Sequence, residues 1–244
     1  MNRKFNYDLT KLYNGLDSLG IEYNDNKINQ LITFYEMVVE KNKVMNLTGI
    51  TEFDEFVYKH FLDSLILEKA FPQIKNNISV IDVGTGAGFP GIPLAIIYDN
   101  AEFTLIDSLN KRVNFLNEVI TALSIENVNA VAGRAEELGK NSSYREQYDL
   151  CVTRAVAEIN LLSEYTLPFV KVGGKCIPYK SLQINDEIEN GSKAISILGG
   201  EIDRVVEIDI NGTDLYRNLL LINKIESTPS KYPRRPGIPK KKPL

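Results

Sequence analysis

A glycine-rich turn follows a short apolar run in the stretch VIDVGTGAGFPGIPLAI. Gly86, Gly88 and Gly91 match the G-x-G-x-x-G spacing of dinucleotide-binding turns. Asp82, Gly84, Gly86 and Gly88 instead match the acidic-x-G-x-G-x-G spacing of S-adenosylmethionine (SAM) methyltransferases. Glycines let the backbone approach a ligand, and the helix that follows offers free N–H groups to an anion. Because that anion is a pyrophosphate in one case and a carboxylate in the other, the glycines alone do not identify the cofactor.

Acidic residues beside this turn favour SAM. Asp82 lies inside the first apolar run, where a carboxylate suits the ammonium group of SAM and repels a pyrophosphate. The alternative for Asp82 is an aspartate that bonds a turn or caps a helix. Asp107 ends the second run, 23 residues after Gly84, and its carboxylate is placed to accept hydrogen bonds from both ribose hydroxyls of either cofactor. Ala135 and Glu136 follow the third run, where methyltransferases contact adenine.

Three further positions could take part in chemistry. Arg154 ends the fourth apolar run, and a guanidinium is costly to bury without an anion, so we expect it to be functional. His60 is the only histidine, and a lone histidine on a helix is commonly a structural hydrogen-bonding residue. Tyr179 and Lys180 end the fifth run, where they line the same cleft or form an interfacial aromatic and its solvated neighbour. The sequence contains no Ser-His-Asp order, metal-ligand spacing or P-loop.

The elements that position these residues alternate between strands and helices after residue 78. Repeated strand–helix units predict an α/β fold with a parallel sheet covered on both faces, and a short link through Gly212 predicts a reversed last strand. Seven strands of this kind form the Rossmann-like sheet of class I SAM methyltransferases. The predicted strands are 79–83, 102–107, 128–132, 148–154, 174–180, 204–210 and 218–225, and the predicted helices are 90–98, 110–123, 157–170 and 183–198.

The chain divides into three parts by pattern. Residues 1–77 predict an N-terminal helical extension or cap, with apolar stripes near 9–19, 27–43 and 52–71. Residues 78–230 form the predicted catalytic domain. Residues 231–244, KYPRRPGIPKKKPL, form a basic tail.

Composition bounds the class of protein. The 244 residues are 43% hydrophobic and 25% charged, which is typical of a globular chain, and no apolar run is long enough for a membrane span. The N-terminus lacks the features of a signal peptide, so we expect a cytoplasmic protein whose Cys151 and Cys176 are buried free thiols. We also expect a monomer without a metal.

Charge is distributed unevenly along the chain. The basic tail holds six Lys and Arg and no acid, which leaves 22 basic against 32 acidic side chains, or −10, on the other residues. This asymmetry fits phosphate binding by the tail. A solvated, disordered end is the alternative, and composition does not separate the two.

Several motifs in chain order together resemble the RsmG (GidB) family of bacterial SAM-dependent methyltransferases, which act on position 7 of one guanine in small-subunit (16S) ribosomal RNA. The resemblance covers nearly the whole chain. Its motifs are NLTGI, HFLDSL, IDVGTGAGFPGIPLAI, LIDSLNKRVNFL, GRAEEL, TRAVA and YPRRPGIPKKKPL.

The resemblance implies roles for the residues within these motifs. Arg154 would lie where SAM meets the target base and, with His60 near the pocket mouth beside Asp63, is a candidate catalytic residue. The implied cofactor-binding residues are Asp82, Gly84, Gly86, Gly88, Phe89, Asp107, Ser108, Leu109, Ala135, Glu136 and Arg154.

The resemblance also agrees with what the sequence lacks. Nitrogen 7 of guanine carries a lone pair and no proton, so its methylation needs alignment with the donor rather than a general base. The Asn/Asp-Pro-Pro-aromatic motif of adenine amine methylases is missing. Two other functions stay open: an NAD-dependent oxidoreductase that uses the glycine-rich turn, and a non-catalytic RNA-binding assembly factor with a degenerate SAM pocket.

Overall fold

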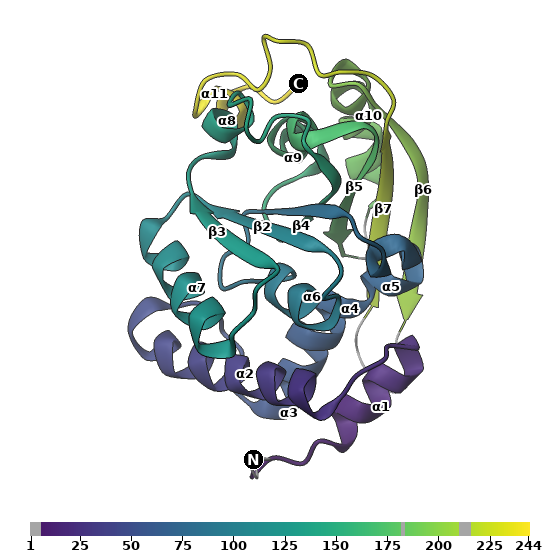
Figure 1. Cartoon of the computed structure of the whole chain (residues 1–244). Coiled ribbons are helices and arrows are strands. Elements are labelled where there is room, and N and C mark those ends of the chain that lie inside the picture. Colours follow the sequence, from purple (N-terminus) through teal and green to yellow (C-terminus); the bar gives the residue numbers. More distant parts are fainter. Residues whose placement is uncertain (1–5, 182–183, 210–215) are drawn as a thin grey trace.

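A seven-stranded sheet forms the centre of the computed structural model, which describes residues 6–181, 184–209 and 216–244 (Figure 1). The strand order is β3-β2-β1-β4-β5-β7-β6. β1 to β5 pair in parallel, whereas β7 is antiparallel to both β5 and β6, so the predicted reversed last strand is confirmed. The strands are β1 (Ser79–Val83), β2 (Glu102–Asp107), β3 (Val128–Ala132), β4 (Tyr148–Arg154), β5 (Val170–Lys180), β6 (Gly200–Asp209) and β7 (Tyr216–Lys224).

Helices flank the sheet and also precede it. The third N-terminal helix is predicted as one piece over 52–71, but the structure divides it with a π-helical segment at Val57–Leu62. The predicted helix 157–170 is α9 followed by a short 3₁₀ turn. The α-helices are α1 (Thr10–Leu19), α2 (Asp25–Met45), α3 (Phe53–Phe56), α4 (Asp63–Leu65), α5 (Leu67–Ala70), α6 (Gly91–Ile97), α7 (Asn110–Leu123), α8 (Ala135–Leu138), α9 (Ile159–Thr166), α10 (Asn185–Ile197) and α11 (Ile238–Lys241).

Two strands begin earlier than the sequence predicts. β5 begins four residues before the predicted 174, because it contains an irregularity where its register with β4 shifts and Gly173 has a φ of 89°. β6 begins four residues before the predicted 204 and lies at the sheet edge, where exposed polar residues hide the strand pattern. Residue 183 of the predicted helix, residue 210 of the predicted strand and the link through Gly212 lie outside the described residues.

The sheet separates two hydrophobic clusters because successive side chains of a strand point to opposite faces. In β1, Val80 packs with α6, α7 and the N-terminal helices, whereas Ile81 and Val83 pack with α9 and α10. Cys151 and Cys176, paired in register on β4 and β5, are both buried free thiols on the second side, as predicted. The structure is therefore layered, with the sheet between helices on one face and helices on the other.

The N-terminal helices pack into the first cluster and have their core in common with the sheet. Phe34 of α2 and Phe61 of the π-helical segment are fully buried there together with Phe103 of β2. Asn24 caps the N-terminus of α2 by accepting a hydrogen bond from the Lys27 amide at 3.0 Å. Figure 1 shows α2 running beneath α6 and α7. The N-terminal helices therefore pack against the same face of the sheet as α6 and α7.

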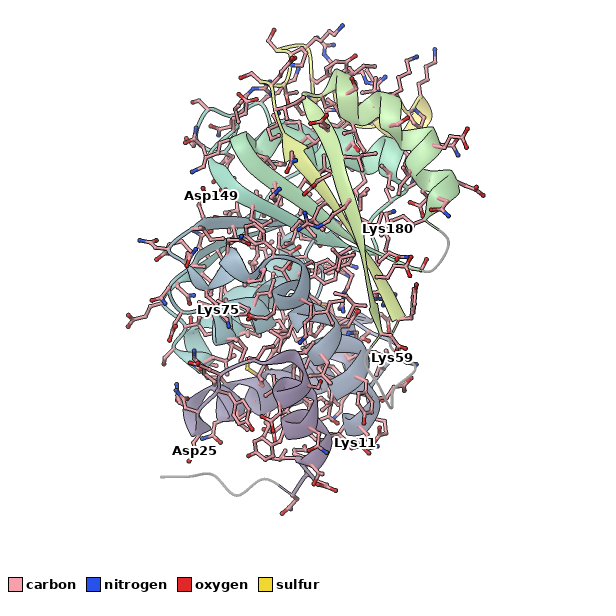
Figure 2. The ribbon with its side chains drawn as sticks, turned by 90° about the vertical axis from the view of Figure 1, so that its right-hand side faces the viewer. Lys11, Asp25, Lys59, Lys75, Asp149 and Lys180 are labelled. Carbon is pink, nitrogen blue, oxygen red and sulfur yellow. The ribbon has the colours of Figure 1, made fainter. Side chains whose placement is uncertain are left out.

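The long axis of the molecule separates the N-terminal helices from the C-terminal segment. In the side view of Figure 2, Lys11 and Asp25 lie on the helices at one end, and Lys180 lies on the sheet in the other half. Among the described residues, no helix is long and apolar enough to cross a membrane.

Candidate active site

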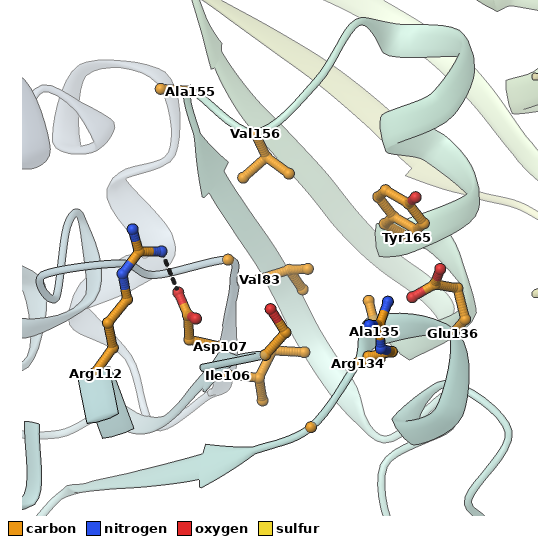
Figure 3. Close-up of a pocket in the computed structure, with 13 residues that line it drawn as sticks. Val83, Ile106, Asp107, Arg112, Arg134, Ala135, Glu136, Ala155, Val156 and Tyr165 are labelled. Carbon is orange, nitrogen blue, oxygen red and sulfur yellow. Dashed lines mark hydrogen bonds and ion pairs between the residues drawn. The ribbon is translucent and has the colours of Figure 1, made fainter. Parts of the chain in front are cut away.

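The carboxyl ends of the parallel strands surround a cavity of about 370 Å³ (Figure 3). An open parallel sheet binds its ligands at this edge, next to the point where the strand order reverses between β1 and β4. The cavity is lined by Val83, Gly84, Ile106, Asp107, Ser108, Arg112, Gly133, Arg134, Ala135, Glu136, Ala155, Val156 and Tyr165. Five of the predicted cofactor residues are in this set: Gly84, Asp107, Ser108, Ala135 and Glu136.

The glycine-rich turn gives the cavity one wall made of backbone. Gly84 has a φ of 76° and Gly86 a φ of 62°, a region that favours glycine. A Cβ atom on Gly84 would lie 2.7 Å from Cγ2 of Val156, across the cavity lining. The amides of Gly84 and Thr85 both donate to the carbonyl oxygen of Ile106, at 2.9 and 3.1 Å. The turn is therefore fixed against the end of β2.

Asp107 connects this turn to the start of α7. Its carboxylate accepts hydrogen bonds from the amides of Gly86 and Leu109, at 3.1 and 2.9 Å, and from Arg112 at 3.2 Å. Asp107 is buried, yet it lines the cavity. A carboxylate has about four acceptor positions and three are used in this way, so Asp107 can accept one further hydrogen bond, which suits a ribose hydroxyl.

Asp82 lies outside the cavity lining and is fully buried. Its Oδ2 accepts a hydrogen bond from the Gly91 amide at 2.9 Å, so its observed contact is that of an aspartate that bonds a turn. Its Oδ1 has no hydrogen-bond partner among the described residues, and burial raises the pKa of the carboxyl to about 7. A Cβ on Gly91 would lie 2.2 Å from Leu105, so the third glycine of G-x-G-x-x-G serves close packing of helix against strand.

Four other predicted cofactor residues lie beside the cavity without lining it: Gly86, Gly88, Phe89 and Leu109. Gly88 packs against α6, α7 and α2, where a Cβ would lie 2.7 Å from Ile92, 2.9 Å from Leu116 and 3.3 Å from Phe34. The Phe89 ring is buried and stacks on His60 with 4.4 Å between ring centroids. These residues shape the turn from behind.

The far end of the cavity is formed by α8 and α9. Ala135 and Glu136 begin α8, and Tyr165 lies on the last turn of α9 (Figure 3). Apolar side chains of Val83, Ile106 and Val156 lie between this end and the Asp107 end. The lining of this cavity fits SAM. It offers a glycine turn that a ligand can approach closely, a carboxylate for the ribose, and an apolar slot that ends on a glutamate for a purine.

A second cavity of about 210 Å³ adjoins the first and shares Ala155 and Val156 with it. Ala155 has a φ of 57°, an uncommon conformation for a residue with a Cβ, and such strain is typical of functional sites. The cavity is lined by Thr153, Arg154, Ala155, Val156, Ala157, Leu162, Tyr179, Lys180, Ser181, Glu187 and Arg217. The structure thus places the predicted Arg154 beside the cofactor cavity rather than within its lining.

Arg154 belongs to a cluster of charges around one buried carboxylate. Asp63 is fully buried, and its Oδ2 lies 2.6 Å from Nη1 of Arg154. Its Oδ1 lies 2.6 Å from Nε of Arg217, a residue of β7. Beside this cluster, Nζ of Lys180 donates to the Ala157 carbonyl and pairs with Glu187 at 2.5 Å. Asp63 and its two arginine partners therefore carry a net charge of +1 beside the second cavity.

His60 contacts Arg154 and lines neither cavity. Its Nδ1 lies 3.2 Å from Nη2 of Arg154, and its Nε2 lies 2.8 Å from the Thr48 hydroxyl. Burial, with the charge of Arg154, lowers the pKa of His60 to about 3. The imidazole is therefore neutral near pH 7, so its contacts are those of a group that orients Arg154.

Sequence reasoning missed several residues that face the two cavities. Arg112 and Tyr165 lie on helical faces that periodicity cannot distinguish from solvated ones. Arg217 lies on a strand far from every motif, and only the pairing of β7 with β5 brings it to the site. Glu187 lies seven residues after Lys180, the predicted end of a strand, and pairs with it. The opposite charges of these two residues could have indicated that they lie together.

Comparison with known proteins adds the family. Residues 27–216 match the family described as rRNA small subunit methyltransferase G. A ribosomal RNA small subunit methyltransferase G from Alkaliphilus metalliredigens is 51% identical over 233 residues, which are 96% of this chain and 97% of that protein. One from Lachnoclostridium phytofermentans is 47% identical over 237 residues, 97% of this chain and 98% of that protein.

Solved structures support the fold. M. jannaschii TYW2 in complex with AdoMet matches with a TM-score of 0.51 at 18% identity, over 67% of this chain and 77% of that one. Aeropyrum pernix fibrillarin with natively bound S-adenosyl-L-methionine matches with a TM-score of 0.52 at 13% identity, over 68% and 75%. The class I methyltransferase fold is therefore confirmed, and a SAM-dependent methyltransferase replaces the NAD-dependent alternative. The chain belongs to the rRNA small subunit methyltransferase G family.

Proposed function

We propose that this protein transfers the methyl group of SAM to nitrogen 7 of one guanine in 16S ribosomal RNA. The observation that carries the proposal is the pair of adjoining cavities with Arg154 at the second of them, in a chain of this family. The first cavity would hold the cofactor. The second would receive the guanine, turned out of an RNA loop because the base must be reached from its edge.

The residues of the first cavity would hold the cofactor by distinct contacts. Asp107 would accept a hydrogen bond from the ribose, and the slot that ends at Glu136 would take the adenine. The turn at Gly84 would let the methionine part lie against backbone. When bound, SAM supplies a methyl group that the lone pair of N7 takes as the C–S bond breaks and its electrons stay on sulfur.

Arg154 would orient the base rather than exchange a proton. N7 carries no proton, so no general base is needed, and the guanidinium has donors that suit O6 next to N7. The guanine becomes positively charged as it accepts the methyl group, so a nearby cation does not stabilise that charge. Arg154 would instead contribute by aligning N7 with the methyl donor. Asp63 and His60, which contact Arg154, would hold its guanidinium plane.

The charge of the second cavity also fits RNA. Arg154, Arg217 and Lys180 outnumber the carboxylates of Asp63 and Glu187. This excess suits the phosphate of the turned-out nucleotide. A pyrimidine C5 methylation would instead need a thiol in the cavity, and Cys151 and Cys176 lie within the sheet core.

Methyl transfer from labelled SAM to 30S subunits that lack the modification tests the proposal. We expect incorporation into one guanine, and none when that guanine is replaced by 7-deazaguanine, which has carbon in place of N7. Incorporation into the 7-deaza substrate would exclude N7 as the acceptor. SAM binding without any incorporation, into 30S subunits or free 16S rRNA, would favour the non-catalytic assembly factor.

A further inference from the structure

The C-terminal segment, residues 225–244, turns back from the end of β7 and lies against the wall of the cofactor cavity. It leaves β7 and runs past α9, so that α11 lies beside α8 (Figure 1). We refer to residues 228–242 as the C-terminal arm. Three sets of contacts join this arm to the rest of the chain.

Arg145 holds the first part of the arm through backbone carbonyl groups. Its guanidinium donates to the carbonyl oxygens of Thr228 at 2.6 Å and Tyr232 at 2.8 Å, and also to Gly139 at 2.9 Å. The Thr228 amide in turn donates to Glu146 at 2.7 Å. Because one guanidinium donates to carbonyl groups of both segments, Arg145 joins the arm to the end of α8.

A buried ion pair holds the middle of the arm. Glu164 of α9 is fully buried, and it receives the backbone amide of Arg234 at 2.7 Å and its Nη2 at 2.6 Å. The adjacent Arg235 is exposed. One of the six tail cations therefore forms an ion pair within the protein. The other five are exposed: Lys231, Arg235, Lys240, Lys241 and Lys242.

The arm touches the cofactor cavity at its adenine end. The amide of Gly237 donates to Oε1 of Glu136 at 3.2 Å, and Glu136 lines the cavity. Glu164 is followed directly by Tyr165, which lines the same end. The arm thus fixes one lining residue by a direct hydrogen bond and the helix of another by the ion pair.

We infer that the C-terminal arm shapes the adenine end of the cofactor cavity and thereby couples the binding of RNA phosphates to the binding of SAM. Arg234 and Gly237 are the positioning residues, and the exposed lysines with Arg235 are the phosphate contacts. RNA held on the exposed cations would keep the arm against Glu136 and Glu164, and so would raise the affinity for SAM. Because coupling between two sites is reciprocal, SAM would raise the affinity for RNA by the same factor. The inference rests on SAM as the ligand of the first cavity and does not depend on which base is methylated.

Adjacent arginines provide the first test, by calorimetric titration of the full chain with SAM in the absence of RNA. Arg234→Ala and Arg235→Ala each remove one charge from the arm, but only the first breaks the pair with Glu164. We expect Arg234→Ala to weaken SAM binding about tenfold, and Arg235→Ala to change it less than about twofold. Equal SAM affinities for folded Arg234→Ala and wild type would overturn the inference.

A second pair of variants keeps the test valid if Arg234→Ala fails to fold. Truncation after Arg235 keeps the ion pair and removes Gly237, whereas Lys240→Gln, Lys241→Gln and Lys242→Gln together remove the same charges and keep Gly237. Only the truncated chain is expected to lose SAM affinity, by about fivefold. Equal affinities for both would show that the arm does not shape the cavity.

Addition of 16S rRNA tests the coupling itself. In the wild type we expect RNA to tighten SAM binding by about fivefold, and in the triple glutamine variant we expect a smaller gain. Tightening of equal size in both proteins, or none in the wild type, would remove the arm from the coupling. The titrations with SAM alone test the role of the arm and do not depend on methyl transfer. A failure to methylate guanine would therefore contradict the proposed function without contradicting the role of the arm.

Discussion

The cofactor cavity and the cluster around Arg154 adjoin each other but are built in different ways. One wall of the cavity is a backbone turn fixed by Asp107, whose partners Gly86, Leu109 and Arg112 all lie within 21 residues of it. The cluster joins Thr48, His60 and Asp63 to Arg154 and Arg217 by contacts that span up to 154 residues.

This difference separates binding from orientation. Local turns place glycines and one carboxylate at a fixed strand edge, which suits a cofactor that is bound in the same way in every turnover. The cluster is formed by ion pairs and hydrogen bonds between the N-terminal helices, β4 and β7. It can therefore form only when these distant segments are packed together. Changes in the cavity should therefore act on cofactor affinity, and changes in the cluster on turnover or pH response.

Replacement of Arg154 by Ala should give the largest effect. We expect kcat for methyl transfer to fall by about 10²-fold, because a misplaced acceptor loses alignment, while the Kd for SAM changes less than about threefold. Arg204→Ala, an exposed arginine on β6 paired with Asp203, is the matched control and should leave both values unchanged. A weakened Kd with an unchanged kcat would place Arg154 on the cofactor side and contradict a separate role for the cluster.

Asp107→Asn should give an intermediate effect of the opposite kind. An amide accepts fewer hydrogen bonds than a carboxylate, so we expect SAM affinity to fall about tenfold, while kcat recovers at saturating SAM. Glu102→Gln, at the exposed start of the same strand, controls for the lost charge. Loss of kcat at saturating SAM would show that the two regions are not separable.

His60→Gln should give the smallest effect, on stability as a function of pH. Because the pKa of folded His60 is lowered to about 3, the neutral form favours folding; this contribution is complete above the unfolded pKa of 6.5 and is lost as pH falls toward 3. Between pH 7 and pH 5.5 the wild type should lose about 1 kcal/mol of unfolding free energy relative to His60→Gln. Urea denaturation at both pH values measures this, and parallel losses in the two proteins would contradict the burial of a neutral imidazole.

The prediction from sequence was most complete where function lies in local pattern. The strand at 79–83, the glycine turn and Asp107 were predicted within the correct elements, because period-2 apolar runs and glycine spacing are local signals. For Asp82 the sequence left two roles open, a contact with the cofactor and a bond to a turn. The structure shows the bond to the Gly91 amide, and the contact with the cofactor stays a prediction.

Local sequence pattern is sufficient to predict the succession of strands and helices, the turn that approaches the cofactor and, through the motifs, the family. Which charges meet depends instead on how the chain folds in three dimensions. Arg217 reaches Asp63 because β7 inserts between β5 and β6, and Arg234 reaches Glu164 because the arm folds back over α9. Such pairs leave no periodic trace along the chain, since an ion pair depends on distance in space and a buried carboxylate accepts whichever cation the topology delivers.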